Sequence, residues 1–208
     1  MPLRMILVRH ASTPWTRERR LQGTRDIALS PEGRAQAEAV GRLLADRPLD
    51  AVYASPLART IETARAIAAS HGQEVRIHPA FADMSFGQWE GLTPPEIEAR
   101  DPEEYRLWTT EPHRAAAPGG DSLGAVRERL VAGLSELRAA HRGQTVVLVG
   151  HGVPSRILIL EALGLGLDRL WSVALSATSV SELEFRDDWT ALHRMNTLVH
   201  LDGLPIAR

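Results

Sequence analysis

The sequence contains no cysteine and no lysine among its 208 residues, and all 24 basic residues are arginine. The absence of cysteine excludes disulfide frameworks, thiolate zinc sites and every mechanism with a cysteine nucleophile. The absence of lysine excludes Schiff-base chemistry, attachment of pyridoxal phosphate and phosphate-binding loops that need a lysine. Genome composition alone can produce such an arginine bias, so the bias by itself does not indicate an anion site.

The charge and the short hydrophobic runs exclude two further classes of protein. The formal net charge is -2 and the sequence pI is about 6.5, which does not favour binding to nucleic acid or to an anionic membrane. The most apolar stretch, residues 146–167, is interrupted by His151, Arg156 and Glu161, whereas a membrane-spanning helix needs about 20 mostly apolar residues. The first apolar run is too short for a secretory signal. We expect a soluble cytoplasmic protein without nucleic-acid or membrane partners.

Short apolar runs alternate with helical patterns along the chain. The runs are typical of strands buried on both faces of a parallel sheet, and the last two predict a hairpin. The expected strands are residues 5–8, 51–53, 74–78, 145–149, 180–185 and 190–195. Helix start signals, in which a small polar residue precedes a helical pattern, stand at Ser30, Ser55, Thr93 and either Asp121 or Ser122.

This alternation predicts an α/β fold, a three-layer sandwich with a mostly parallel, roughly six-stranded mixed sheet covered by helices on both faces. The length suits one domain, so residues 1–208 are expected to form a single domain. The segment from about 81 to 120 interrupts the alternation and is rich in proline. We interpret it as an insertion over one end of the sheet.

Basic side chains follow three of the expected strands at the point where each strand ends. Arg9 and His10 follow the first strand, Arg59 lies soon after the second, and His151 follows the run at residues 145–149. Ligands of open α/β sheets bind at the carboxyl ends of the strands. Arginine donates in pairs to phosphate, and histidine serves as a nucleophile or as a donor. The flanking Gly152 allows a ligand to approach the backbone closely. The sequence thus predicts a metal-free oxyanion pocket.

Ordered motifs over most of the chain resemble those of the histidine phosphatase superfamily, the phosphoglycerate mutase-like proteins. They are Leu7-Val8-Arg9-His10-Ala11-Ser12-Thr13, Leu21-Gln22-Gly23, Ser55-Pro56-Leu57-Ala58-Arg59-Thr60, Phe86-Gly87-Gln88-Trp89-Glu90-Gly91, Pro118-Gly119-Gly120-Asp121-Ser122 and Val149-Gly150-His151-Gly152. The last 50 or so residues carry little of this resemblance. It implies a phosphatase without a cofactor or metal, acting on a small phosphorylated metabolite, as a monomer or homodimer.

The resemblance also implies a role for each matching residue. His10 would attack phosphorus and form a phosphohistidine, while Arg9, Arg59 and His151 would hold the phosphoryl oxygens. Substrate-binding positions would be Thr16, Gln22, Gly23 and Gly152.

The general acid of the family, commonly a glutamate, corresponds here to Asp83. Aspartic acid is shorter and intrinsically more acidic, so its surroundings would have to keep it protonated. Glu90 is the alternative general acid.

Four hypotheses about the activity are compatible with these motifs. A phosphatase for a small phosphomonoester is favoured, because the segment after Asp83 is short and the chain lacks the lysine often found in cofactor-dependent phosphoglycerate mutases. The alternatives are phosphoglycerate mutase-type phosphoryl transfer, a protein phosphohistidine phosphatase and a non-catalytic phosphate-binding regulatory protein. The substrate stays open among α-ribazole phosphate, sugar phosphates, phosphoglycerate derivatives, phosphoserine and broad phosphomonoesters.

Overall fold

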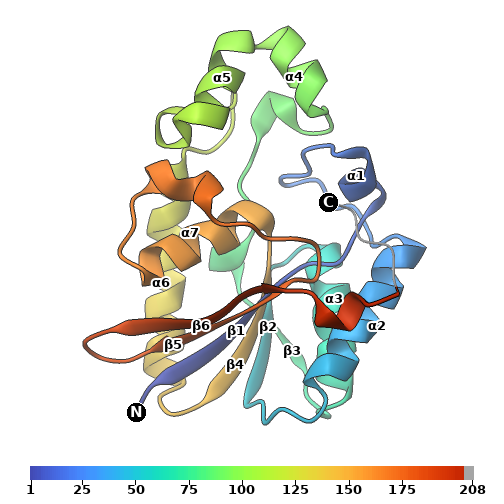
Figure 1. Cartoon of the computed structure of the whole chain (residues 1–208), viewed down its shortest axis with the longest axis vertical. Coiled ribbons are helices and arrows are strands. Elements are labelled where there is room, and N and C mark those ends of the chain that lie inside the picture. Colours follow the sequence, from blue (N-terminus) through green and yellow to red (C-terminus); the bar gives the residue numbers. More distant parts are fainter. Residues whose placement is uncertain (204–208) are drawn as a thin grey trace.

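A computed structural model describes residues 1–203, so the last five residues of the expected domain lie outside the described part of the chain. Its centre is a six-stranded sheet in the order β3-β2-β4-β1-β5-β6 (Figure 1). The strands are β1 (Leu3–Arg9), β2 (Ala51–Ala54), β3 (Val75–Ile77), β4 (Thr145–Gly150), β5 (Val180–Phe185) and β6 (Thr190–Thr197). The strands from β3 to β1 are parallel, whereas β5 and β6 form an antiparallel hairpin at one edge. The predicted α/β fold with a mixed sheet is confirmed.

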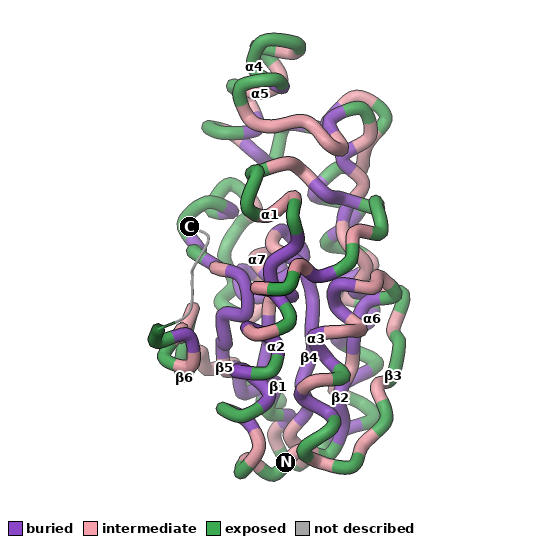
Figure 2. The backbone as a smooth tube through the Cα atoms, turned by 90° about the vertical axis from the view of Figure 1, so that its right-hand side faces the viewer, coloured by how far each residue is buried: buried purple, intermediate pink, exposed green. Residues whose placement is uncertain are grey.

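Helices cover both faces of the sheet. They are α1 (Pro14–Glu18), α2 (Pro31–Leu44), α3 (Ala58–Ala69), α4 (Pro94–Arg100), α5 (Pro102–Thr110), α6 (Leu123–Ala140) and α7 (Gly152–Ala162). Successive residues of β1 point to opposite faces, so Met5 packs with the core under α6 and α7 while Ile6 packs with the core under α2 and α3. Figure 2 shows β1 and β4 buried along most of their length. No helix among residues 1–203 is long and apolar enough to cross a membrane.

Three of the four helix starts begin as their sequence signals predict. Ser30 caps α2 and Ser122 caps α6, each accepting a hydrogen bond from a backbone amide in the first turn. Thr93 and Glu96 form a capping box at α4. The prediction for Ser55 is wrong, because α3 begins only at Ala58. The Ser55 hydroxyl contacts side chains in the core instead of capping the helix.

The segment between β3 and α6 lies beyond the carboxyl ends of the parallel strands. Figure 1 shows α4 and α5 at the end of the molecule opposite the N-terminus. Trp89 is fully buried within this segment, and its indole N–H donates to Asp101 at 2.8 Å. Trp108 packs edge-on against both Phe86 and Trp171. The buried tryptophans Trp89 and Trp108 therefore join this segment to the core under α7.

Candidate active site

Two histidines lie side by side at the carboxyl edge of the sheet. β1 and β4 are parallel neighbours in which Arg9 pairs with Gly150, so the next residues, His10 and His151, leave the sheet at the same level. The backbone amide of His10 donates to the carbonyl of Gly150 at 2.9 Å. The ring centroids of the two histidines are 5.4 Å apart, and both residues are buried.

The ring of His10 has a defined tautomer. Its Nδ1 lies 2.7 Å from the backbone carbonyl of Ala11, and a carbonyl oxygen only accepts, so Nδ1 carries the hydrogen. Burial lowers the pKa of His10 well below its usual value, and the charges of Arg59 and Arg9 lower it further. The ring is therefore neutral near pH 7, with a lone pair on Nε2 that is available to attack an electrophile.

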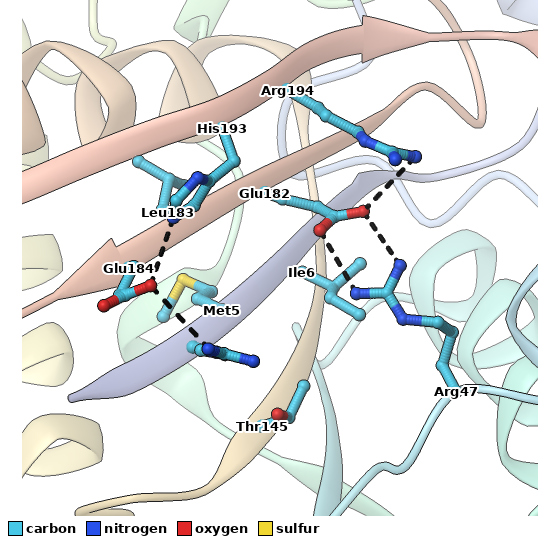
Figure 3. A pocket seen from close by; sticks show the side chains of 10 residues that line it. Met5, Ile6, Arg47, Thr145, Glu182, Leu183, Glu184, His193 and Arg194 are labelled. Atoms are coloured by element: carbon cyan, nitrogen blue, oxygen red, sulfur yellow. Dashed lines mark hydrogen bonds and ion pairs between the residues drawn. The ribbon is translucent and has the colours of Figure 1, made fainter. Parts of the chain in front are cut away.

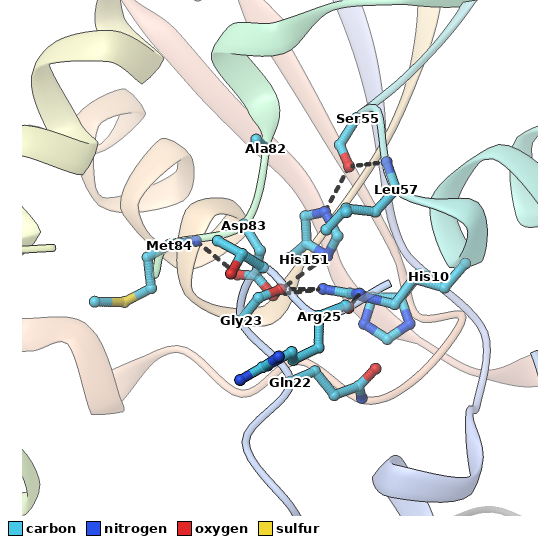
Figure 4. Close-up of polar contacts among 12 residues, drawn as sticks. His10, Gln22, Gly23, Arg25, Ser55, Leu57, Ala82, Asp83, Met84 and His151 are labelled. Atoms are coloured by element: carbon cyan, nitrogen blue, oxygen red, sulfur yellow. Dashed lines mark hydrogen bonds and ion pairs between the residues drawn. The ribbon is translucent and has the colours of Figure 1, made fainter. Parts of the chain in front are cut away.

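His151 lies between Ser55 and Asp83 (Figure 4). Its Nε2 is 2.6 Å from the Ser55 hydroxyl, which also lies 3.0 Å from the hydroxyl of Thr60. Its Nδ1 lies 3.4 Å from Oδ2 of Asp83. Burial, followed by the charge of Arg59, lowers the pKa of His151 well below its usual value. The ring is therefore neutral, and its contact with Asp83 is not an ion pair.

Arg59 is fully buried, although it stands in the first turn of α3. Its Nη1 donates to the carbonyl of Arg25 and its Nη2 to the carbonyl of Gly23, both at 2.7 Å. Nη2 also donates to Oδ2 of Asp83 at 3.0 Å. Two backbone carbonyls and one carboxylate thus hold the guanidinium at a fixed place beside both histidines.

Of the two candidate acids, only Asp83 contacts an imidazole. Burial raises the pKa of Asp83 to about 6, although the charge of Arg59 acts in the opposite direction. The carboxylate of Glu90 accepts hydrogen bonds from the amide and hydroxyl of Thr24, both at 2.9 Å, and pairs with Arg25 at 3.3 Å. Glu90 is therefore engaged in organising the neighbouring loop, while Asp83 lies in the site.

Three buried nitrogen atoms in this cluster have no hydrogen-bond partner among residues 1–203: Nε of Arg9, Nε of Arg59 and Nδ1 of His151. Another nitrogen of Arg9, Nη1, donates to the carbonyl of Leu175 at 2.7 Å, which holds that guanidinium in place. Buried polar atoms are normally satisfied, and the two arginine nitrogens can only donate, so this cluster indicates a ligand that accepts hydrogen bonds. With two arginines in the set, an oxyanion such as a phosphoryl group fits.

A pocket of about 360 Å³ opens beside His10. Its lining comprises Arg9, His10, Arg19, Arg20, Leu21, Gln22, Asp83, Phe86, Trp108, Gly152, Val153, Arg156 and Trp171. Of the predicted substrate-binding residues, Gln22 and Gly152 belong to this lining, while Thr16 and Gly23 do not. The Thr16 hydroxyl belongs to the capping box of α1, and Gly23 contributes its carbonyl to Arg59. Among the residues described, no group of three His, Asp or Glu side chains could hold a metal ion.

Comparison with known proteins identifies the family. The family described as the histidine phosphatase superfamily (branch 1) matches residues 5–198. This chain belongs to that superfamily.

Several relatives of this histidine phosphatase carry phosphatase names. It is 36% identical over 199 residues to phosphoserine phosphatase 1 of Hydrogenobacter thermophilus, covering 96% of this chain and 94% of the relative. Glucosyl-3-phosphoglycerate phosphatase of Mycolicibacterium vanbaalenii is 34% identical over 177 residues, with 82% and 78% covered. A mutant phosphoserine phosphatase of Entamoeba histolytica, solved with phosphoserine, is 28% identical with a TM-score of 0.86, and 96% and 99% of the chains are covered. The protein is a phosphatase.

Sequence reasoning missed three residues that the structure of this histidine phosphatase places in or around the site. Ser55 contacts His151, a residue 96 positions away. Arg129, on α6, donates to the carbonyls of Ala80, Ala82 and Asp83 and so anchors the loop that bears the acid. Arg156 lines the pocket from α7. Arg129 and Arg156 lie in helices with strongly apolar faces. An arginine within such a helix was the one local signal that could have pointed to these two residues.

A second pocket, lined partly by β5 and β6, differs from this site in its charge (Figure 3). Glu182 pairs with Arg47 and Arg194, and Glu184 pairs with His193 and Arg4 among others. Its cationic groups are thus neutralised by the protein itself, so it shows no unmet demand for an anion.

Proposed function

We propose that this histidine phosphatase hydrolyses a small phosphomonoester through a phosphohistidine on His10, without a metal ion or cofactor. The observation that carries the proposal is the state of His10, whose Nδ1–H is held by the Ala11 carbonyl so that Nε2 bears the lone pair. Around this ring lie the unsatisfied Nε–H donors of Arg9 and Arg59 and the unpartnered Nδ1 of His151, a set that suits the oxygens of a phosphoryl group.

In the first step, Nε2 of His10 forms a bond to phosphorus while the bond from phosphorus to the leaving oxygen breaks. Burial raises the pKa of Asp83 to about 6 and the negative charge of the bound phosphoryl group raises it further, so Asp83 holds a proton in the substrate complex and donates it to that oxygen. The alcohol leaves, and Asp83 is then a carboxylate. Arg9 and Arg59 stabilise the charge that develops on the phosphoryl oxygens.

In the second step, a water molecule attacks phosphorus and the bond between nitrogen and phosphorus breaks. Asp83 accepts the proton of that water, and the electron pair returns to Nε2. Orthophosphate leaves, and both His10 and Asp83 regain their starting states. The 3.0 Å contact between Asp83 and Arg59 keeps the carboxylate in the site throughout the cycle.

The setting of the activity is also part of the proposal. We place the enzyme in the cytoplasm, as a monomer or homodimer whose partner is a small phosphorylated metabolite. The absence of cysteine fits a reducing compartment. The two arginines supply the positive charge that a metal ion supplies in other phosphatases.

The test is phosphate release by EDTA-treated protein from p-nitrophenyl phosphate and a panel of metabolite phosphomonoesters, with His10→Ala beside it. We expect turnover to survive EDTA and to be lost in the variant, because no other group replaces Nε2. Rapid quenching with a labelled substrate should trap an acid-labile, base-stable phosphoenzyme.

Two results would contradict the proposal: equal phosphate release by both proteins, or a phosphoenzyme on another residue. Interconversion of phosphoglycerates stimulated by a bisphosphate would favour the mutase alternative. Phosphate binding without any turnover would favour a regulatory protein.

A further inference from the structure

The pocket beside His10 contains a cation that the phosphoryl mechanism does not use. Arg156 projects from α7 and lines the pocket. Its Nε donates to the carbonyl of Val173 at 2.8 Å, and its guanidinium carbon lies 5.3 Å from the ring centroid of Trp171. These two contacts orient the guanidinium and leave the edge formed by Nη1 and Nη2 without a hydrogen-bond partner among residues 1–203.

Arg156 also lacks a counter-charge. Within the described part of the chain, no carboxylate lies within 4.0 Å of Arg156, Arg9 or Arg19, whereas Arg20 is paired with Glu18. The one carboxylate in the pocket lining is that of Asp83, which is bonded to Arg59. Burial lowers the pKa of Arg156 to about 10, and the charge of Arg9 acts in the same direction. One phosphoryl dianion held by Arg9 and Arg59 leaves this further positive charge without a partner.

Two of the pocket arginines, Arg9 and Arg156, approach each other at Gly152. A β-carbon at this position would lie 3.2 Å from Nη1 of Arg156 and 3.6 Å from Nε of Arg9. Both nitrogen atoms are therefore close to one point, and the glycine keeps the space between them open. An anion on Arg156 must then be only a few bonds from the phosphoryl group on Arg9, which is the spacing in a phosphorylated acid of two or three carbon atoms.

We infer that Arg156 binds a carboxylate on the leaving group, so that the substrate is a small phosphomonoester of a hydroxy acid. This inference rests on the proposed phosphatase function and names its substrate class. A carboxylate matches the free edge of the guanidinium, because two planar groups form paired hydrogen bonds. Trp108 and Trp171 stand beside it with centroids 5.0 Å apart, and the Trp171 N–H donates to the Trp108 carbonyl at 2.7 Å. The inserted segment thereby joins the wall of this subsite.

The test compares substrates that differ only in the carboxylate. 3-Phosphoglycerate has a carboxylate where glycerol 3-phosphate has a hydroxymethyl group, and O-phosphoserine has a carboxylate where O-phosphoethanolamine has a hydrogen atom. We expect the wild-type protein to prefer the acid of each pair in kcat/KM. In Arg156→Gln, we expect this preference to fall by about 10- to 100-fold, mainly through KM, because a hydrogen bond to a charged group is lost. Arg156→Lys, which keeps the charge without the paired donors, should give an intermediate preference.

Arg169→Gln is the matched control. This arginine stands two residues before Trp171, which lines the pocket, but it is exposed and paired with Asp168 at 3.2 Å, so the substrate preference should not change. Circular dichroism and thermal unfolding of each variant separate a local loss from a failure to fold.

The outcomes separate the two proposals. If the wild-type protein hydrolyses glycerol 3-phosphate and His10→Ala does not, the phosphatase function is supported. This conclusion does not depend on the result for Arg156→Gln. If Arg156→Gln lowers kcat/KM equally for both substrates of a pair, the carboxylate subsite is overturned, and Arg156 is assigned to supporting Arg9. A wild-type enzyme without preference for the acids would overturn it as well. Absence of turnover on every substrate would contradict the proposed function, and the subsite with it.

Discussion

At the scale of single residues, the site depends on one carboxyl group whose proton affinity is set by its surroundings. Asp83 is buried, accepts a hydrogen bond from Arg59 and lies beside a neutral His151. Desolvation disfavours its charged form more than Arg59 favours it, and its pKa rises to about 6. Burial therefore lets this aspartic acid keep its proton to a higher pH than an exposed aspartic acid would.

This pKa sets the direction of the pH dependence. In the proposed mechanism the proton donor is the neutral form of Asp83, whose fraction falls as the pH rises through about 6, so kcat/KM for alkyl phosphomonoesters should decline above that pH. A bound phosphoryl dianion raises the pKa of Asp83 further, which places the decline in kcat at higher pH. His10 imposes no limb near neutral pH, because its pKa lies well below 6.5.

Asp83→Asn should remove this limb and slow alkyl substrates by about 100-fold or more, with a smaller effect on p-nitrophenyl phosphate, whose leaving group needs no proton. Glu90→Gln is the matched control and should keep the limb. Full pH–rate profiles of the three proteins check this. An unchanged limb in Asp83→Asn would show that another group is the acid.

At the scale of secondary structure elements, the turn between β2 and α3 carries two functions that are close in sequence. Its first residue, Ser55, bonds to His151, and Arg59 enters the site from the first turn of the helix. The Ser55 hydroxyl is engaged by His151 and Thr60, and α3 has no side-chain cap hydrogen bond at Leu57. The Ser55 side chain thus bonds to His151 instead of capping α3.

Ser55→Ala should reduce kcat/KM by about 10-fold, because the buried Nε2 of His151 loses its hydrogen bond and the ring loses its orientation. Ser70→Ala, at the other end of α3, removes a bond to the carbonyl of Ile67 and should leave activity unchanged. Steady-state kinetics with p-nitrophenyl phosphate compare the two. Equal activity of both variants would show that Ser55 does not position His151.

At the scale of the whole molecule, the segment that carries α4 and α5 is closed at its base. The amide of Gln88 donates to the carbonyl of Pro118, and the amide of Asp121 donates to the carbonyl of Ser85, both at 2.9 Å. The two ends of a long excursion are thus tied together beside the pocket. Phe86 and Trp108 can then wall the pocket from a segment that is not part of the sheet.

Gly87→Ala tests this closure. Gly87 has a φ of +49°, and a β-carbon there would collide with the backbone of Pro118 and Gly120. Gly119→Ala is the matched control, because its φ is +71° but its β-carbon would meet no atom within 4 Å. The control should lose about 1–2 kcal/mol of unfolding free energy from the left-handed backbone alone. Gly87→Ala should lose more, by about 1–3 kcal/mol, from the collision. Equal losses in urea unfolding would show that the closure is not tight.

Local patterns in the sequence were sufficient to predict much of the fold and part of the candidate site. Continuous apolar runs predicted the buried strands, and Ser30 and Ser122 predicted helix starts, because these signals depend on neighbouring residues. The same runs placed His10 and His151 at strand ends, where a parallel sheet brings them together. Only the tertiary structure showed that Asp83 contacts an imidazole while Glu90 contacts Thr24 and Arg25, gave Ser55 its partner and placed Arg156 in the pocket. Each of these outcomes depends on contacts between residues far apart in the chain, and such contacts leave no periodic signal in the sequence.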